Sequence, residues 1–138
     1  MKEEKVKKPL VSEEQARQEI ESWLDYKKID DSQREENEST IKSLISYVKS
    51  GHLVLNEDKT FTHKLKFELE SAGIKELTYK ARITEREITQ KLHGVKADDV
   101  DGRIAATIAA LSTQVIGIVR GLDKEDFKIA RSVALFFM

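Results

Sequence analysis

Three histidines are the residues of this chain best suited by type to acid–base chemistry or metal binding. His52, His63 and His93 share no His-x-x-x-His spacing, which would place two imidazoles on one face of a helix. Each is therefore more typical of an ordinary strand or surface histidine than of a metal ligand.

An acidic cluster at residues 98–102 resembles the start of a calcium-binding loop. An EF-hand loop would need an acidic residue where Ala97 stands and a bidentate glutamate where Ile108 stands. The pattern fails at both ends. The acids are better explained as the N-terminal cap and first turn of a helix, where negative charge is stabilising.

Other catalytic and cofactor motifs are absent from the sequence. The chain contains no cysteine, no Gly-Lys-Ser/Thr triplet and no Gly-x-Ser-x-Gly turn. A thiolate metal site, a disulfide and a cysteine nucleophile are excluded, and nucleotide binding has no support. We therefore expect no catalytic residue, no metal site and no cofactor, and we expect that the protein is not an enzyme.

The charge distribution argues against a nucleic-acid partner. The net charge of the 138 residues is −1, and residues 13–38 carry ten acidic residues against four basic ones. Recognition of a phosphate backbone needs a clustered positive field. The N-terminus lacks the apolar core of a secretory signal, and the apolar run 104–119 is too short and too polar to span a bilayer, so we expect no membrane partner.

The N-terminal part of the chain predicts a helical hairpin. Residues 1–10 are rich in lysine and glutamate before the only proline, Pro9, and are expected to form a mobile terminus. Residues 11–51 form an expected N-terminal helical arm, whose first helix runs over about 12–28 and whose second ends at Gly51. Each helix has one narrow apolar stripe, so the arm must pack against something else, and Trp23 is expected to anchor the first helix to a sheet.

After Gly51 the apolar residues recur at every second position instead of at helical spacing. Residues 53–55 alternate, residues 61–69 alternate apolar and polar over nine positions, and residues 77–83 alternate again. Turn residues separate these runs. The pattern predicts a small antiparallel hairpin or meander with one face in water.

Helical periodicity returns for the rest of the chain. Thr84 begins a short helix that stops at Gly94, an apolar helical pattern from Val100 to Ile118 is interrupted near Thr113, and Asp123 caps a last helix. Residues 52–138 therefore form an expected α+β domain, and the whole chain is expected to be α+β, mostly helical with a small antiparallel sheet.

The last helix is apolar nearly all round. Between residues 127 and 137 only Lys128, Arg131 and Ser132 are polar. Such a helix is either buried on several sides in the protein's own core or covered by a partner. The two alternatives stay open from the sequence.

The order of elements from Leu53 to Met138 resembles the tail assembly chaperones of tailed bacteriophages. Members of that family tend to run in the order strand, Leu-Thr-x-Arg, Pro-Thr, helix, Ala-x-Leu-Thr-Gly, Val-Leu, Leu-x-x-x-Asp-Phe and helix, and several segments of this chain are similar to parts of that order. They are Glu76 to Thr84, Ile108 to Ser112, Val115-Ile116, Leu122 to Phe127 and Phe136-Phe137. Ile83 stands where the family often has proline, and Thr113 where glycine is common. Residues 1–50 lie outside the resemblance.

The resemblance implies a small protein of the host cytoplasm that coats the apolar tape measure protein before the tail tube polymerises. It also implies recruitment of the tail tube subunit through a longer form made by ribosomal frameshifting. Because the segments Ile104 to Val119 and Phe127 to Phe137 have more apolar positions than a thin core needs, we expect them to form the partner groove. The expected partner-binding residues are Ile108, Leu111, Val115, Ile118, Phe127, Val133, Phe136 and Phe137.

One variant and one alternative make this interpretation testable. Serine at both Phe136 and Phe137 should abolish co-purification with the tape measure protein while leaving the thermal melt nearly unchanged. The alternative is a structural or adaptor subunit of a virion or other oligomeric assembly, in which the same apolar helix mediates self-association. A stable closed oligomer in light scattering would favour that alternative.

Overall fold

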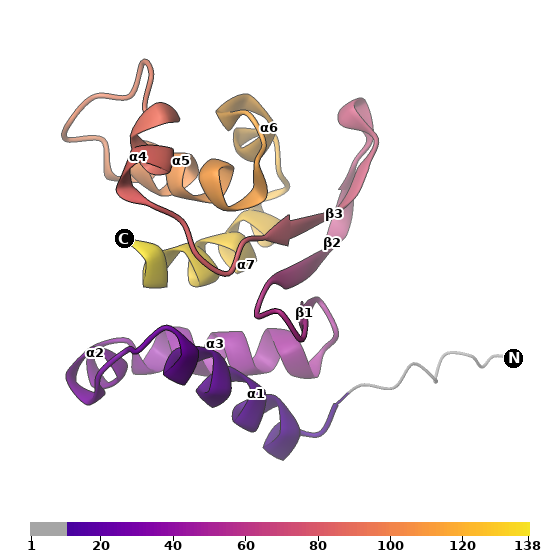
Figure 1. Cartoon of the computed structure of the whole chain (residues 1–138). Helices are drawn as coiled ribbons and strands as arrows, with labels where there is room; N and C mark the ends of the chain where they lie inside the picture. Colours follow the sequence, from indigo (N-terminus) through magenta and orange to yellow (C-terminus); the bar gives the residue numbers. More distant parts are fainter. Residues whose placement is uncertain (1–10) are drawn as a thin grey trace, which may run out of the picture.

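The computed structural model describes residues 11–138, so the segment 1–10, expected to be a mobile terminus, lies outside the described residues. The N-terminal part contains three helices (Figure 1). They are α1 (Glu13–Tyr26), α2 (Asp31–Glu36) and α3 (Glu38–Lys49). The side chain of Ser12 caps α1 by accepting a hydrogen bond from the backbone N–H of Gln15. The short α2 was not predicted, although a capping box formed by Asp30 and Gln33 marks its start.

Three antiparallel strands follow in the spatial order β1-β2-β3. They are β1 (Leu53–Leu55), β2 (Phe61–Leu69) and β3 (Ile74–Tyr79). A single 3-10 turn, η2 (Glu70–Ala72), joins β2 to β3. The predicted strand 77–83 is therefore displaced: β3 begins earlier and ends at Tyr79, because the turn closes sooner than the alternation indicates.

Four helices and a final 3-10 turn complete the chain. They are α4 (Glu85–Gln90), α5 (Val100–Ser112), α6 (Ile116–Arg120), α7 (Lys124–Ala134) and η3 (Leu135–Phe137). Thr84 and Asp123 cap α4 and α7 as predicted, and Asp99 caps α5. The expected interruption near Thr113 is also present, since Thr113 takes a left-handed conformation (φ 56°) that separates α5 from α6.

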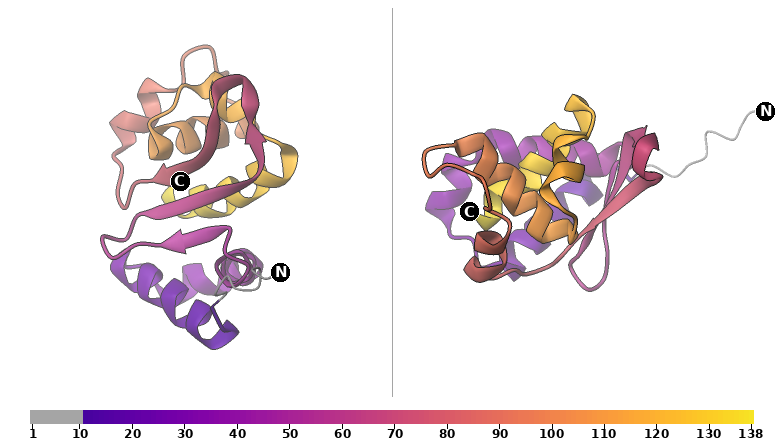
Figure 2. Two further views of the ribbon diagram at one scale, coloured as in Figure 1. Left: turned by 90° about the vertical axis from the view of Figure 1, so that its right-hand side faces the viewer. Right: turned by 90° about the horizontal axis from the view of Figure 1, so that it is seen from above.

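The prediction of an α+β fold, mostly helical with a small antiparallel sheet, is confirmed. The helices lie against one face and one edge of the sheet, as the three views in Figures 1 and 2 show. On the inner face α5 packs against β3 and α7 against β2, while α3 packs against β1 at the edge. Alternate side chains of β2 are therefore buried and solvated at its start, as the period of two predicted.

Trp23 joins the helical arm to the rest of the molecule. Its ring is fully buried and meets the ring of Phe61 on β2 edge-on at 5.0 Å between centroids and that of Phe136 at 5.7 Å. The expected anchoring of α1 to the sheet is thus observed. The arm and residues 52–138 share one continuous apolar core.

Candidate functional site

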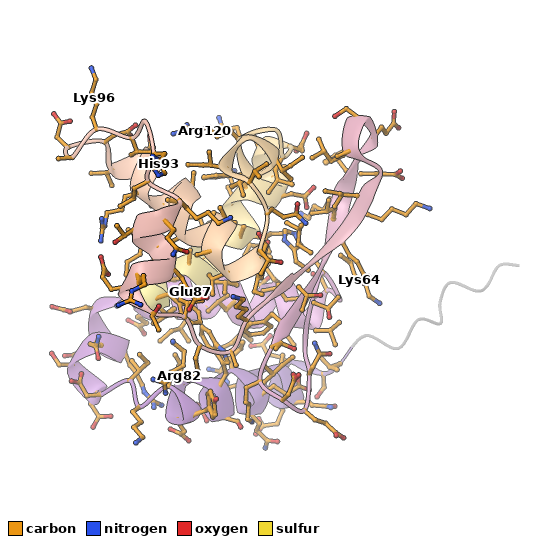
Figure 3. All side chains as sticks on the ribbon, turned by 45° about the horizontal axis from the view of Figure 1, so that its top comes forward. Lys64, Arg82, Glu87, His93, Lys96 and Arg120 are labelled. Carbon is orange, nitrogen blue, oxygen red and sulfur yellow. The ribbon has the colours of Figure 1, made fainter. Side chains whose placement is uncertain are left out.

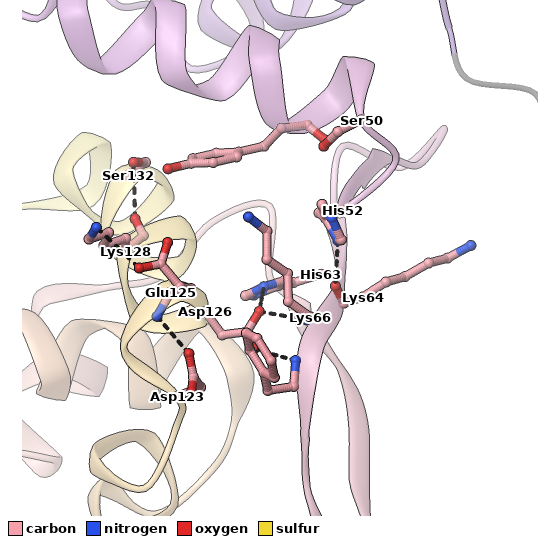
Figure 4. A network of polar contacts seen from close by, with 12 residues as sticks. Ser50, His52, His63, Lys64, Lys66, Asp123, Glu125, Asp126, Lys128 and Ser132 are labelled. Carbon is pink, nitrogen blue, oxygen red and sulfur yellow. Dashed lines mark hydrogen bonds and ion pairs between the residues drawn. The ribbon is translucent and has the colours of Figure 1, made fainter.

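A buried polar cluster links the sheet to α7. The side chains of His63, Tyr79 and Asp126 are almost completely inaccessible. Nδ1 of His63 lies 2.7 Å from the hydroxyl of Tyr79. Figure 4 shows the second contact of the ring, in which Nε2 lies 3.2 Å from Oδ1 of Asp126. We refer to these three residues as the Tyr–His–Asp cluster.

A neutral imidazole satisfies every group in this cluster. Burial and the carboxylate of Asp126 raise the pKa of Tyr79 well above its usual value, so its hydroxyl stays protonated. This hydroxyl donates a hydrogen bond to Nδ1 of His63. Nε2–H of His63 then donates to Asp126. Burial lowers the pKa of His63 to about 4, against the opposing effect of Asp126, because a charged imidazole is disfavoured away from water.

Asp126 also repairs an irregular part of the sheet. The pairing of β2 with β3 shifts register between Lys64 and Leu69. There the two carboxylate oxygens of Asp126 accept hydrogen bonds from the backbone N–H of Lys66 at 2.8 Å and of Phe67 at 2.9 Å. The carboxylate therefore replaces strand partners that the irregularity removes, and it fixes α7 against β2.

This arrangement resembles a catalytic triad in its residue types only. No member can touch a substrate, because all three are sealed between β2, β3 and α7. Within residues 11–138, no group of three or more His, Asp or Glu side chains is placed to hold a metal ion. The cluster is a structural connection.

One feature of the sequence points to this cluster, although it was not among the predictions. Asp126 lies on the same helical face as Ile129 and Val133, which are both buried. A carboxylate on an apolar stripe needs hydrogen-bond partners.

The eight expected partner-binding residues do not form one surface. Ile108, Leu111, Val133 and Phe136 lie in the chain's own core. The other four are accessible to different degrees: Val115 is 63% exposed, whereas Ile118, Phe127 and Phe137 are half-buried. In the folded protein only this second group can meet a partner.

The accessible residues lie at two ends of α7. Val115 and Ile118 belong to the α6 region, which precedes α7, whereas Phe137 follows α7. The length of α7, about 16 Å, separates the two groups. Burial also requires one correction. Phe136 packs on Trp23, so serine at both Phe136 and Phe137 should destabilise the fold, contrary to the expectation from sequence.

An open groove of about 240 Å³ lies beside the end of η3. We call it the C-terminal groove. It is lined by Lys27, Arg82, Ile83, Phe136, Phe137 and Met138. These residues come from three distant segments: the end of α1, the link between β3 and α4, and the last turn of the chain. Figure 3 shows Arg82 on that link, next to the N-terminal helices.

The groove combines apolar and cationic groups. The ammonium of Lys27 stands 3.4 Å from the ring centroid of Phe137, a cation–π contact. Burial, together with the nearby charge of Arg82, lowers the pKa of Lys27 to about 8. Met138 leaves 52% of its surface in water. The groove therefore offers apolar contact area beside two positive charges.

A second groove, of about 270 Å³ between α1 and α3, differs in its charges. Its carboxylate Glu13 is already paired with Lys49 at 3.3 Å and with Arg17 at 3.4 Å. Because these charges neutralise one another, this groove has less to offer a charged partner.

No protein-family model, curated protein or solved structure matches this chain. In addition, no helix within residues 11–138 has the combined length and apolar character needed to cross a bilayer.

Proposed function

We propose that this protein is a tail assembly chaperone of a tailed bacteriophage. It binds an apolar helical segment of the tape measure protein in the host cytoplasm and keeps that protein soluble until the tail tube forms. It performs no catalysis. The observation that carries the proposal is the apolar end of the chain, where Phe137 and Met138 remain accessible in the C-terminal groove after the core is complete.

Several features support this proposal. The elements from β1 to η3 occur in the order that the resemblance implies, and Asp126 of the Leu122 to Phe127 motif holds α7 against β2 through hydrogen bonds from two backbone N–H groups. A fixed α7 positions the last turn, and with it Phe137, at the surface. An amphipathic helix that lays its apolar face in such a groove is a common mode of peptide recognition.

The proposal predicts that a long helical protein, the tape measure protein, is encoded beside this chain, and co-expression of the two proteins tests it. We expect the long protein to stay in the soluble fraction and to co-purify with this chain, and to aggregate when it is expressed alone, because its apolar stripes are then uncovered. Equal solubility with and without this chain would contradict the proposal. A stable closed oligomer of this chain in light scattering, with no affinity for the long protein, would support the structural-subunit alternative instead.

A further inference from the structure

The two cations of the C-terminal groove have no acidic partner among the described residues. Other cations close to them do: Lys80 is paired with Glu87 at 2.7 Å and Arg34 with Asp25 at 2.8 Å. No carboxylate of residues 11–138 forms an ion pair with Lys27 or Arg82. Two like charges held together in a half-buried groove repel each other, and an anion placed between them would remove that repulsion.

The surroundings of Lys27 restrict which anion fits. The groups packed against its ammonium are the rings of Phe137 and Trp23, at 3.4 Å and 5.8 Å to the centroids, and the charge acting on it is that of Arg82. Of the apolar side chains in the groove, Met138 is 52% exposed and Phe137 is half-buried, whereas Phe136 is buried. A ligand that presents a carboxylate with an apolar group beside it matches both the two cations and these two accessible side chains.

An amphipathic helix presents this pair of groups. Side chains three or four positions apart on a helix lie about 5–6 Å apart at their Cβ atoms. On the basis of the proposed function, we propose that the C-terminal groove binds a partner helix that carries an acidic side chain three or four positions from a large apolar one. Lys27 and Arg82 bind the carboxylate, and Phe137 and Met138 contact the apolar side chain.

The charge of Lys27 adds a pH dependence to this interaction. With its pKa at about 8, Lys27 loses its proton in the free protein as the pH rises through that value. The affinity for the carboxylate should therefore be highest at or below pH 7 and should fall between pH 7 and pH 9.5. The affinity that remains at pH 9.5 is due to the charge of Arg82. Arginine at position 27 stays charged in this range, so Lys27→Arg should give a flat profile.

Two synthetic helical peptides of about 15 residues test the inference. They are identical except that one has Glu and the other Gln four positions from a Phe, and binding is followed by fluorescence anisotropy of a dye on the peptide. We expect the intact chain to bind the Glu peptide about tenfold more tightly than the Gln peptide at pH 7. Lys27→Met/Arg82→Met should remove this preference and leave binding of the Gln peptide nearly unchanged.

The matched control is Lys64→Met/Lys75→Met, which removes two exposed cations of the sheet and changes the net charge by the same amount. It should keep the preference for Glu. The inference is overturned if the intact chain binds neither peptide, if it does not distinguish them, or if the control loses the preference to the same extent.

These outcomes are separate from the test of the proposed function. If the long helical protein co-purifies but the peptides are not distinguished, carboxylate recognition is wrong and the chaperone proposal stands. If the Glu peptide is preferred but the long protein does not co-purify, the groove binds acidic helices of another partner.

Discussion

Replacement of Asp126 by alanine is expected to lower the free energy of unfolding by about 3–5 kcal/mol. The substitution leaves three donors without their acceptor: the buried Nε2–H of His63 and the part-buried backbone N–H groups of Lys66 and Phe67. Each unsatisfied buried donor costs about 1–3 kcal/mol. Urea denaturation followed by far-UV circular dichroism measures the loss.

Asp123→Ala is the matched control for Asp126→Ala. It removes the same side chain from the same end of α7, but the carboxylate of Asp123 only caps the helix at the surface, by accepting from the N–H of Glu125 at 2.9 Å. Loss of such a cap costs about 1 kcal/mol. Equal destabilisation by the two substitutions would mean that the Tyr–His–Asp cluster contributes no more than an exposed cap.

Alanine at Phe136 is expected to cost about 3–5 kcal/mol of stability, and alanine at Phe137 only about 1 kcal/mol. Phe136 is 8% exposed and packs edge-on against Trp23, so its removal leaves a cavity at the point where the arm meets the domain. Phe137 is half-buried, and its loss removes a tilted contact with Trp23 at 6.1 Å and the cation–π contact with Lys27.

These adjacent residues of one type form their own control. The same urea experiment on both single variants measures the difference between them. Similar losses from both substitutions would show that the last turn packs as a unit, and Phe137 would then belong to the core and could not serve as a free contact residue.

Much of the fold could be predicted because its signals are local. The caps at Ser12, Thr84 and Asp123 and the alternation over 61–69 are properties of a few neighbouring residues. The α2 helix was missed because it buries no side chain and so has no apolar stripe to detect. The end of β3 was missed because alternation continues past Tyr79 after pairing with β2 has stopped.

The candidate site depends on contacts between distant segments, which periodicity does not report. The apolar excess at the C-terminus was visible in the sequence, but the burial of Phe136 and the partial exposure of Phe137 depend on how the last turn packs against Trp23 of the distant α1. Lys27 precedes the three strands in the sequence and Arg82 follows them, yet both residues line the C-terminal groove. The role of Asp126 likewise depends on an irregularity in β2 that has no pattern of its own.

Co-purification of the long helical partner with the Phe137→Ser variant tests the central claim most directly. Phe67→Ser is the matched control, since Phe67 is also an accessible phenylalanine, 56% exposed, but lies on the sheet away from the C-terminal groove. We predict that Phe137→Ser loses the partner and Phe67→Ser retains it, with both variants folded by far-UV circular dichroism. Retention of the partner by Phe137→Ser at the level of the unsubstituted chain would contradict the account.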